Sequence, residues 1–324
     1  MSRNFNKFFA LVLAFLLALL GAAAAKTVHP SSFAASKAID VPALLSASEK
    51  TSKVPALATY PLTLKGSKDT STIHSDWASF QDGAAFVFKA DMDTDCDGLD
   101  YKCDGNADGQ PVTNWGALSA FEVPYIVIPQ AFLEANPVAI PGNNVAAVIC
   151  NKKMFYAILG DTNGNNPQVT GEASLLLART CFSKANLSGD RGHEEVDVTY
   201  IVYTGPKAVL PPTALDDNYI TDFDKLRSMG DDLTTSLSRN LGISLLSPGS
   251  PPHDEEDDSD QDGTTDGTTE PSAPGPPDFG SGASVQSHRP APQLMALFVA
   301  LVGLVVMNNP QNPWSLAFFP LLGP

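Results

Sequence analysis

The chain is organised around residues 145–181, VAAVICNKKMFYAILGDTNGNNPQVTGEASLLLARTC. Two apolar runs, 145–150 and 154–159, flank a turn at Asn151-Lys152-Lys153, and this pattern predicts two buried strands. A loop rich in Gly, Asn and Pro follows, with Asp161 at its start. From Glu172 onward the residues favour a helix and no helix breaker intervenes. The stretch therefore predicts two carboxylates at opposite ends of one loop, one leaving a strand and one entering a helix.

Further short strands are expected on both sides of this stretch. The candidates are the apolar or alternating runs 84–88, 125–128 and 196–203. Short strands separated by turn residues indicate a mainly β protein, a β-barrel or a compact sheet, rather than a βαβ fold. Apolar residues spaced by three or four across 215–241 predict an amphipathic helix, interrupted at Gly230, that covers the barrel. Structural cover is favoured here over an interaction helix.

The N-terminal residues 1–25 are typical of a signal peptide. A basic start, an apolar run and a small-residue cleavage region occur in that order, and the apolar run is shorter than the roughly 20 residues of a membrane span. Secretion is therefore expected. Residues 26–60 form an N-terminal arm, for which a pro-segment, a short helix over 41–48 and a loose arm all stay open, and no function is assigned to it.

The four cysteines are expected to form disulfides in an oxidising compartment. Of three possible connectivities we favour Cys96 with Cys103 and Cys150 with Cys181, because each pair brackets one segment. There is no CxxC motif and the histidines are scattered singly, so neither a metal site of the zinc type nor a cofactor is expected. Asn186 begins an N-glycosylation sequon in a predicted surface loop.

The formal net charge of −16 argues against nucleic acid as a partner. Nine acidic residues lie within 254–270, which leaves −7 for the rest of the chain. An acidic secreted protein repels anionic lipid and attracts a cationic polymer. Acidity that serves solubility alone is an equally weighted alternative.

The C-terminal quarter changes composition. Residues 247–292 are rich in Pro, Gly, Ser, Thr and acid and predict an extended linker. Small residues at 280–284, within the linker, precede an apolar run at 294–307 in the tail, 293–324, and this pattern matches a GPI-attachment signal. The chain continues past that run, so a weak membrane anchor or a non-native tail stays an alternative.

The segment 91–106, DMDTDCDGLDYKCDGN, is a second candidate site. Asp93, Asp95 and Asp97 match the first half of a calcium loop, with Asp104 at the twelfth position in place of the usual Glu. The glycines and the proline that follow forbid the second helix of such a motif. Three interpretations compete: acidic subsites for a cationic ligand, which we favour, a solvated turn held by a disulfide, and a calcium site.

Asp161 and Glu172 are the only carboxylates of the central stretch. Glycoside hydrolysis needs two positioned carboxyl groups, one to protonate the leaving oxygen and one to activate water or attack the sugar. From spacing alone, local roles in a turn and at a helix start are the better-supported interpretation.

Several stretches resemble a known family. WGALSAFEVPYIVIP (115–129), the block from 143 to 182 with GDTNG and GEAS, and DVTYIVY (197–203) are similar to the fungal chitosanases of glycoside hydrolase family 75. The acidic segment and NYITDFDKLRSMGDDL (218–233) resemble that family too, so the likeness covers 64–241 within an expected catalytic domain at 61–243. The resemblance implies a small six-stranded β-barrel of the double-psi type with a few packed helices. It also implies endo-hydrolysis of β-1,4 bonds in chitosan with inversion.

The resemblance places the catalytic pair on Asp161 and Glu172. Glu172 is the expected general acid and Asp161 the expected base, although a helix N-terminus at Glu172 would argue for the reverse. Asp93, Asp95, Asp97 and Trp115 are candidate substrate-binding residues. We expect a secreted monomer that acts on chitosan. The alternatives are a non-catalytic protein that binds the cell wall and a calcium-dependent surface protein.

Overall fold

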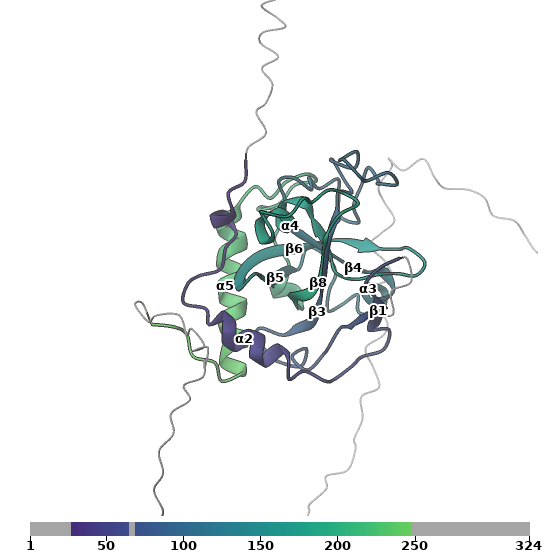
Figure 1. Ribbon diagram of the computed structural model, residues 1–324. Coiled ribbons are helices and arrows are strands. Elements are labelled where there is room, and N and C mark those ends of the chain that lie inside the picture. The colour runs from purple at the N-terminus through teal and green to yellow at the C-terminus, as the bar shows by residue number, and fades with distance from the viewer. Residues whose placement is uncertain (1–26, 65–68, 248–324) are drawn as a thin grey trace, which may run out of the picture. The chain divides into compact units, whose positions relative to one another are not determined.

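The computed structural model describes residues 27–64 and 69–247 (Figure 1). The predicted signal peptide, the linker after Ser247 and the C-terminal tail with its GPI signal lie outside the described residues. Among the residues that are described, no helix combines the length and the apolar character needed to cross a membrane.

Six strands close into a barrel in the order β3-β7-β4-β6-β5-β8. The strands are β3 (Ala85–Asp95), β4 (Tyr125–Pro129), β5 (Val145–Cys150), β6 (Lys153–Asn163), β7 (Glu172–Ser174) and β8 (His193–Tyr203). Pairing is mixed, since β3–β7 and β4–β6 are parallel and the other pairs are antiparallel. The prediction of a mainly β, six-stranded barrel is confirmed, and the double-psi type stays a prediction.

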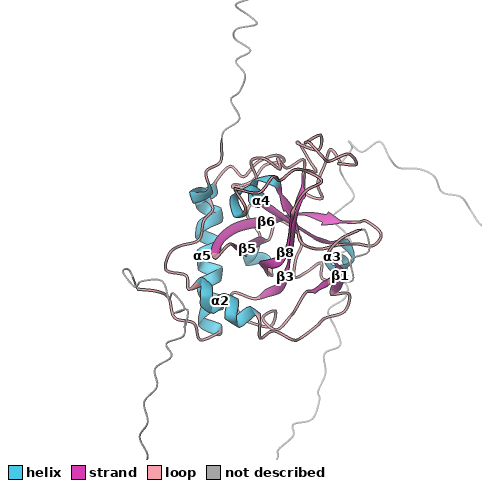
Figure 2. Ribbon diagram, viewed as in Figure 1, coloured by secondary structure: helices cyan, strands magenta, loops and turns pink. Residues whose placement is uncertain are grey.

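The remaining elements surround this barrel. Figure 2 shows the strands gathered in the middle, with α5 and α2 along one side. The helices are η1 (Pro30–Ser32), α2 (Val41–Ser48), α3 (Gln130–Ala135), α4 (Leu175–Cys181), η2 (Pro206–Ala208) and α5 (Phe223–Asn240). Two short strands, β1 (Thr59–Pro61) and β2 (Thr70–Thr72), form a separate antiparallel pair.

The central stretch departs from its prediction in two places. Strand β6 continues to Asn163, so Asp161 lies within a strand and not at the start of a loop. Glu172 begins strand β7, and the helix starts only at Leu175, with Ser174 as its N-cap. The expectation of a helix from Glu172 is wrong because hydrogen bonding of β7 to both β3 and β4 outweighs its local helix propensity. Because no helix begins at Glu172, the helix dipole gives no reason to exchange the expected roles of acid and base.

Helix α5 also differs from its prediction. It begins at Phe223, capped by Asp222, and passes through Gly230 without a break. A Cβ atom at Gly230 would lie 2.4 Å from the ring of Tyr156, so this glycine lets the helix lie directly on the barrel. Tyr156 also donates to Asp231 over 2.7 Å, which fastens the contact. Gly230 therefore serves packing, and the expected interruption is wrong.

The N-terminal arm packs on the barrel along its described length. The short helix over 41–48 is present as α2, and Phe33 is completely buried. The backbone N–H of Ala35 donates to the carbonyl oxygen of Met154 over 3.0 Å, and Ala34 bridges Phe155. These contacts cover the β6 side of the barrel.

Both expected disulfides are present. Cys96 joins Cys103 across 7 residues, and Cys150 joins Cys181 across 31 residues. The second bond ties the end of β5 to the end of α4, so it encloses β6, the following loop and β7. Both strands that carry the candidate catalytic residues lie within that closed loop.

Candidate active site

Asp161 and Glu172 lie in one row across the barrel. Asp161 on β6 pairs with Val127 on β4, Val127 pairs with Glu172 on β7, and Glu172 pairs with Asp93 on β3. Paired residues on neighbouring strands point to the same face of a sheet. Strands are spaced about 4.8 Å apart, so the backbones of Asp161 and Glu172 are roughly 9–10 Å apart.

A register shift brings Asp161 onto this face. Ile126 pairs with Leu159 but Val127 pairs with Asp161, so Gly160 is passed over in the ladder. Without the shift Val127 would face Gly160, and Asp161 would point to the opposite side, because one residue of register reverses every side chain. A Cβ atom at Gly160 would lie 2.6 Å from Tyr125, so the tight packing of the shift admits only glycine.

Asp161 is buried, with 6% of its surface exposed. Its Oδ1 accepts hydrogen bonds from the backbone N–H groups of Asn114 over 3.0 Å and Thr162 over 2.8 Å. Burial raises the pKa of Asp161 to about 6, and these two bonds, which favour the anion, limit the rise. Asp161 is therefore largely ionised at neutral pH.

Glu172 is partly exposed, and its pKa is higher than that of Asp161. Its Oε2 accepts one hydrogen bond, from Nδ2 of Asn163 over 2.9 Å. Desolvation raises the pKa of Glu172 to about 8, and the negative charges of Asp93 and Asp161 add to the rise. Two carboxyl groups of one row thus differ in pKa, which suits a proton donor at Glu172 and a proton acceptor at Asp161.

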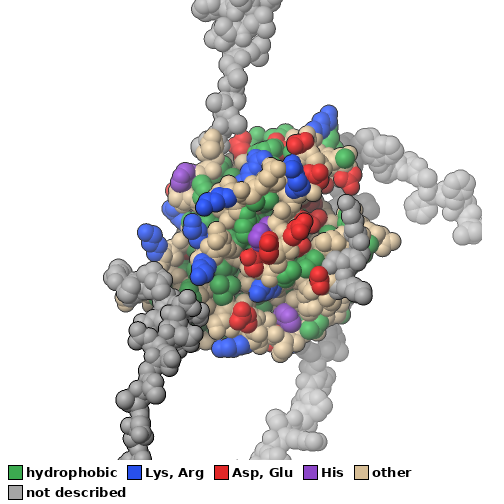
Figure 3. All heavy atoms as spheres, viewed as in Figure 1, with side chains coloured by type: hydrophobic (Ala, Val, Ile, Leu, Met, Phe, Trp, Pro, Cys, Tyr) green, Lys and Arg blue, Asp and Glu red, His purple; other side chains and the backbone are tan. Residues whose placement is uncertain are grey.

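Strand β3 adds carboxyl groups beside this pair. Every second residue of β3 from Asp91 is acidic, and these side chains share the face of Glu172 because Asp93 is in register with it. We call the following six residues the acidic face: Asp91, Asp93, Asp95, Asp97, Asp161 and Glu172. None of them takes part in an ion pair within 27–64 and 69–247. In Figure 3, acidic side chains gather near the centre of the face shown, and most Lys and Arg side chains lie to its left.

Burial raises the pKa of every member of the acidic face, and a neighbouring carboxylate adds to each rise, Glu194 in the case of Asp93 and Asp108 in the case of Asp97. Burial is the largest cause in each case and raises the pKa of Asp93 to about 6. For Asp95, the charges of Glu172 and Asp161 contribute next. Because none of the ion pairs of the described residues involves the acidic face, its carboxyl groups can attract a cationic ligand.

Asp91 is the most deeply buried carboxyl group of β3, with 4% of its surface exposed and no hydrogen-bond partner for Oδ1 in the described part of the chain. Burial raises the pKa of Asp91 to about 8, and the charge of Asp93 adds to it. A raised pKa in the folded state favours folding below the unfolded value near 4, and this contribution is lost as pH rises through about 8.

Asp91→Asn is therefore expected to raise the melting temperature by about 5 °C at pH 8 and to leave it nearly unchanged at pH 4. The measurement is thermal unfolding of both proteins at the two pH values. An equal change in melting temperature at pH 4 and pH 8 would contradict an effect of the Asp91 charge.

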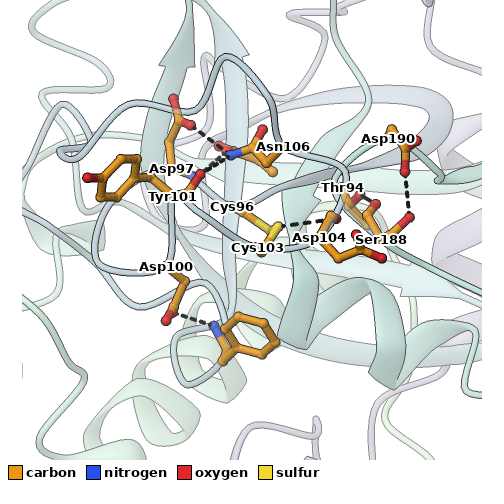
Figure 4. The surroundings of a disulfide bond; sticks show 12 residues. Thr94, Cys96, Asp97, Asp100, Tyr101, Cys103, Asp104, Asn106, Ser188 and Asp190 are labelled. Atoms are coloured by element: carbon orange, nitrogen blue, oxygen red, sulfur yellow. Dashed lines mark hydrogen bonds between the residues drawn. A yellow bond between two sulfur atoms is a disulfide. The ribbon is translucent and has the colours of Figure 1, made fainter.

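The segment after β3 is a loop cross-linked by the Cys96–Cys103 disulfide (Figure 4). Asp93 and Asp95 lie on β3, so the helix–loop–helix arrangement of the calcium motif is absent from this segment. Asp97 Oδ1 accepts from the backbone N–H of Gln110 over 2.8 Å and from Asn106, while Asp100 accepts from Ser119 over 2.7 Å. Carboxyl oxygens of Asp95, Asp97 and Asp161 lie within 4.8 Å of one another, close enough to surround one cation.

Trp115 lies close to this site, since its neighbour Asn114 contacts Asp161. Its partly buried indole packs against Gly142, where a Cβ atom would lie 1.9 Å from the ring. Tyr125 is fully buried and donates to the carbonyl oxygens of Asp95 and Asp97, so it belongs to the core. Asn186 is exposed, as a glycosylation site requires.

Sequence reasoning missed three residues that contact or adjoin the pair. Asp91 completes the alternation of acids along β3, a signal that was present in DMDTD. Asn163 follows Asp161 by two residues in GDTNG and hydrogen bonds to Glu172. Asn114 has no signal of its own, because only the fold brings its loop to β6.

Comparison with known proteins identifies the family of this chain. The family model described as fungal chitosanase of glycosyl hydrolase group 75 matches residues 92–236. Endo-chitosanase B of Aspergillus oryzae is 36% identical over 197 residues, which cover 51% of this chain and 80% of that protein. The chain belongs to the fungal chitosanases of glycosyl hydrolase group 75.

Two further endo-chitosanases are also similar. Endo-chitosanase C of Aspergillus oryzae is 64% identical over 211 residues, covering 65% of this chain, and an endo-chitosanase of Aspergillus fumigatus is 34% identical over 179 residues. This chain spans 55% of the length of endo-chitosanase C. The match to the Aspergillus fumigatus protein covers 48% of this chain and 74% of that protein. The group 75 match contains every member of the acidic face except Asp91.

Proposed function

We propose that the chain is a secreted endo-chitosanase that hydrolyses β-1,4 bonds of chitosan with inversion. One observation carries the proposal: Asp161 and Glu172 share a face two strands apart, and their pKa values are about 6 and about 8. Group 75 membership supports the substrate, since the similar Aspergillus proteins are named endo-chitosanases.

The spacing of the pair favours inversion over retention. Inverting glycosidases hold their carboxyl groups about 6.5–9.5 Å apart so that a water fits between the sugar and the base, whereas retaining enzymes need about 5 Å. The backbones of Asp161 and Glu172 are two strand spacings apart, roughly 9–10 Å, which leaves room for the wider separation of their carboxyl groups. The intervening residue is Val127, which offers no competing proton acceptor.

The mechanism assigns one proton transfer to each carboxyl group. Glu172 holds a proton near neutral pH and donates it to the leaving glycosidic oxygen. Asp161, ionised and held by two backbone N–H groups, removes a proton from the water that attacks the opposite side of the sugar ring. The bond to the anomeric carbon breaks as the water oxygen forms the new one, and a single displacement inverts the configuration.

Substrate binding is assigned to the acidic face. Chitosan carries ammonium groups, and their positive charge favours the ionised forms of Asp93, Asp95 and Asp97 beside Glu172. Trp115 is a candidate for stacking on a sugar ring next to Asp161. Because the attraction is electrostatic, the KM for chitosan is expected to rise with salt.

The pH dependence of kcat/KM should be bell-shaped. Activity is expected to rise as Asp161 loses its proton around pH 6 and to fall as Glu172 loses its proton around pH 8. Initial rates on soluble chitosan oligomers between pH 4 and 10 test this. A profile that rises through a single ionisation and stays level to pH 10 would contradict a protonated acid at Glu172.

The test of the proposed function is release of reducing ends from highly deacetylated chitosan by the full chain, with chitin as the comparison polymer. Rapid chain shortening of chitosan supports an endo-chitosanase. Binding to chitosan without cleavage would instead support the alternative, a non-catalytic wall-binding protein. Activity lost to a chelator and restored by calcium would support a calcium-dependent protein.

The remaining parts of the proposal rest on the sequence. Secretion follows from the signal peptide at 1–25 and agrees with the two disulfides. Attachment through a GPI signal within 293–324, glycosylation at Asn186 and a monomeric state are proposed on the same basis. Release of the protein from cells by a phosphatidylinositol-specific phospholipase tests the attachment.

A further inference from the structure

Asn163 connects the candidate general acid to the loop that precedes it. It is the last residue of β6, and 6% of its surface is exposed. Its Nδ2 donates to Oε2 of Glu172 over 2.9 Å. Asn163 lies on the β6 strand that carries Asp161, so one strand holds both the candidate base and the hydrogen-bond partner of the candidate acid.

Two backbone hydrogen bonds fix the orientation of the Asn163 amide. Its Oδ1 accepts from the backbone N–H of Asn165 over 3.1 Å and from that of Val169 over 3.3 Å. Backbone N–H groups can only donate, so the amide oxygen must face them. A reversed amide would set its NH₂ group against two donors. The NH₂ group therefore has to face Glu172.

The fixed amide distinguishes the two oxygens of Glu172. A protonated carboxyl group has one hydroxyl oxygen and one carbonyl oxygen, and the carbonyl oxygen is the better acceptor. Because Oε2 accepts from Asn163, the acidic proton is favoured on Oε1. The loop between β6 and β7 is fastened further by Gln168, whose Oε1 accepts from the backbone N–H of Ala131 over 2.9 Å.

We propose that Asn163 is a positioning residue that orients the carboxyl group of Glu172 and keeps its transferable proton on Oε1. It acts through Glu172 and has no assigned contact with substrate. The inference rests on the proposed function for the role of that proton. The orientation of the amide and its effect on Glu172 can be measured in the free protein.

The donated bond also stabilises ionised Glu172. Asn163 lowers the pKa of Glu172 against the larger effect of desolvation. Asn163→Asp is nearly isosteric and still accepts from Asn165 and Val169, but it replaces the donor with a second carboxyl group. The pKa of Glu172 is expected to rise by about 1 unit or more in Asn163→Asp, because two adjacent carboxyl groups resist double ionisation. Asn163→Ala removes the donor without adding charge, and a smaller rise is expected.

The experiment is a ¹³C NMR titration of the glutamate carboxyl groups in the substrate-free full chain, with Glu172→Gln used to assign the Glu172 signal. It is paired with kcat and KM measurements on chitosan oligomers. A loss of orientation is expected to lower kcat about 10²-fold in Asn163→Ala with little change in KM. The exposed neighbour Asn165→Ala keeps its backbone N–H and is the matched control, with a wild-type titration expected.

A Glu172 titration that is unchanged in both Asn163 variants would overturn the inference. So would equal losses in Asn163→Ala and Asn165→Ala, which would assign the effect to the loop as a whole. If Asn163→Asp fails to fold by circular dichroism, the titration and kinetics of Asn163→Ala decide alone. If the wild type does not cleave chitosan, the proposed function fails, while the titration still decides whether Asn163 controls Glu172.

Discussion

Glu172→Gln is expected to lower kcat on chitosan by about 10³-fold to 10⁴-fold, with a similar loss in Asp161→Asn. Glutamine keeps the shape of Glu172 but has no acidic proton that it can transfer to the leaving oxygen. Asparagine at position 161 can still accept one hydrogen bond, yet it cannot take the proton of the attacking water. KM should change little in either variant, because the acidic face retains its other carboxyl groups.

The control for these variants is Glu49→Gln, an exposed carboxylate at the C-terminal end of α2. It makes the same chemical change as Glu172→Gln at an exposed position and should retain wild-type kinetics. Circular dichroism and thermal unfolding confirm that each variant is folded. Folded Glu172→Gln with more than a tenth of the wild-type kcat would exclude Glu172 as the general acid. The same result for Asp161→Asn would exclude Asp161 as the base.

Removal of the Cys150–Cys181 disulfide is expected to have the largest effect on stability. The bond closes a loop with a sequence separation of 31 residues. The loop-entropy relation gives a loss of about 3.5 kcal/mol in the free energy of unfolding for Cys150→Ala/Cys181→Ala. For a domain of this size the melting temperature should fall by about 10 °C. Thermal unfolding of the double variant gives the measurement.

Cys96→Ala/Cys103→Ala is the matched comparison, since its loop has a sequence separation of only 7 residues. The same relation gives about 2.5 kcal/mol, so the Cys150–Cys181 variant should be the less stable of the two. If the Cys96→Ala/Cys103→Ala variant were the less stable of the two, the loop-entropy relation would not account for the stabilities. The segment after β3 would then depend on its disulfide more strongly than β6 and β7 depend on theirs.

The barrel strands could be predicted from the sequence because their signals are local. Apolar and β-branched runs identified β4, β5 and β8, and the Asn151-Lys152 turn between β5 and β6 has the positive φ angles of a tight hairpin. Strand β7 could not be predicted in this way. It has three residues in a helix-favouring context, and its conformation depends on hydrogen bonds to β3 and β4, which are distant in sequence.

The candidate pair illustrates the same limit. The resemblance to group 75 indicated which two carboxylates to examine, but their shared face depends on the register shift at Gly160. A register shift of this kind is set by packing, here of Tyr125 against Gly160, and no periodic pattern in the sequence reveals it. The helix start expected at Glu172, which would argue for the reverse roles, is absent. The proposed roles of Glu172 as acid and Asp161 as base are argued instead from the hydrogen bonds and burial of each carboxyl group, which only the folded structure gives.

The most direct test of the proposed roles of Asp161 and Glu172 is ¹H NMR of the products in the first minutes of chitosan oligomer cleavage by the wild type. An acid at Glu172 and a base at Asp161, two strands apart, predict that the new reducing ends appear first as the α-anomer and then mutarotate. Initial formation of the β-anomer would mean retention through a covalent intermediate, and it would contradict the proposed roles of both residues.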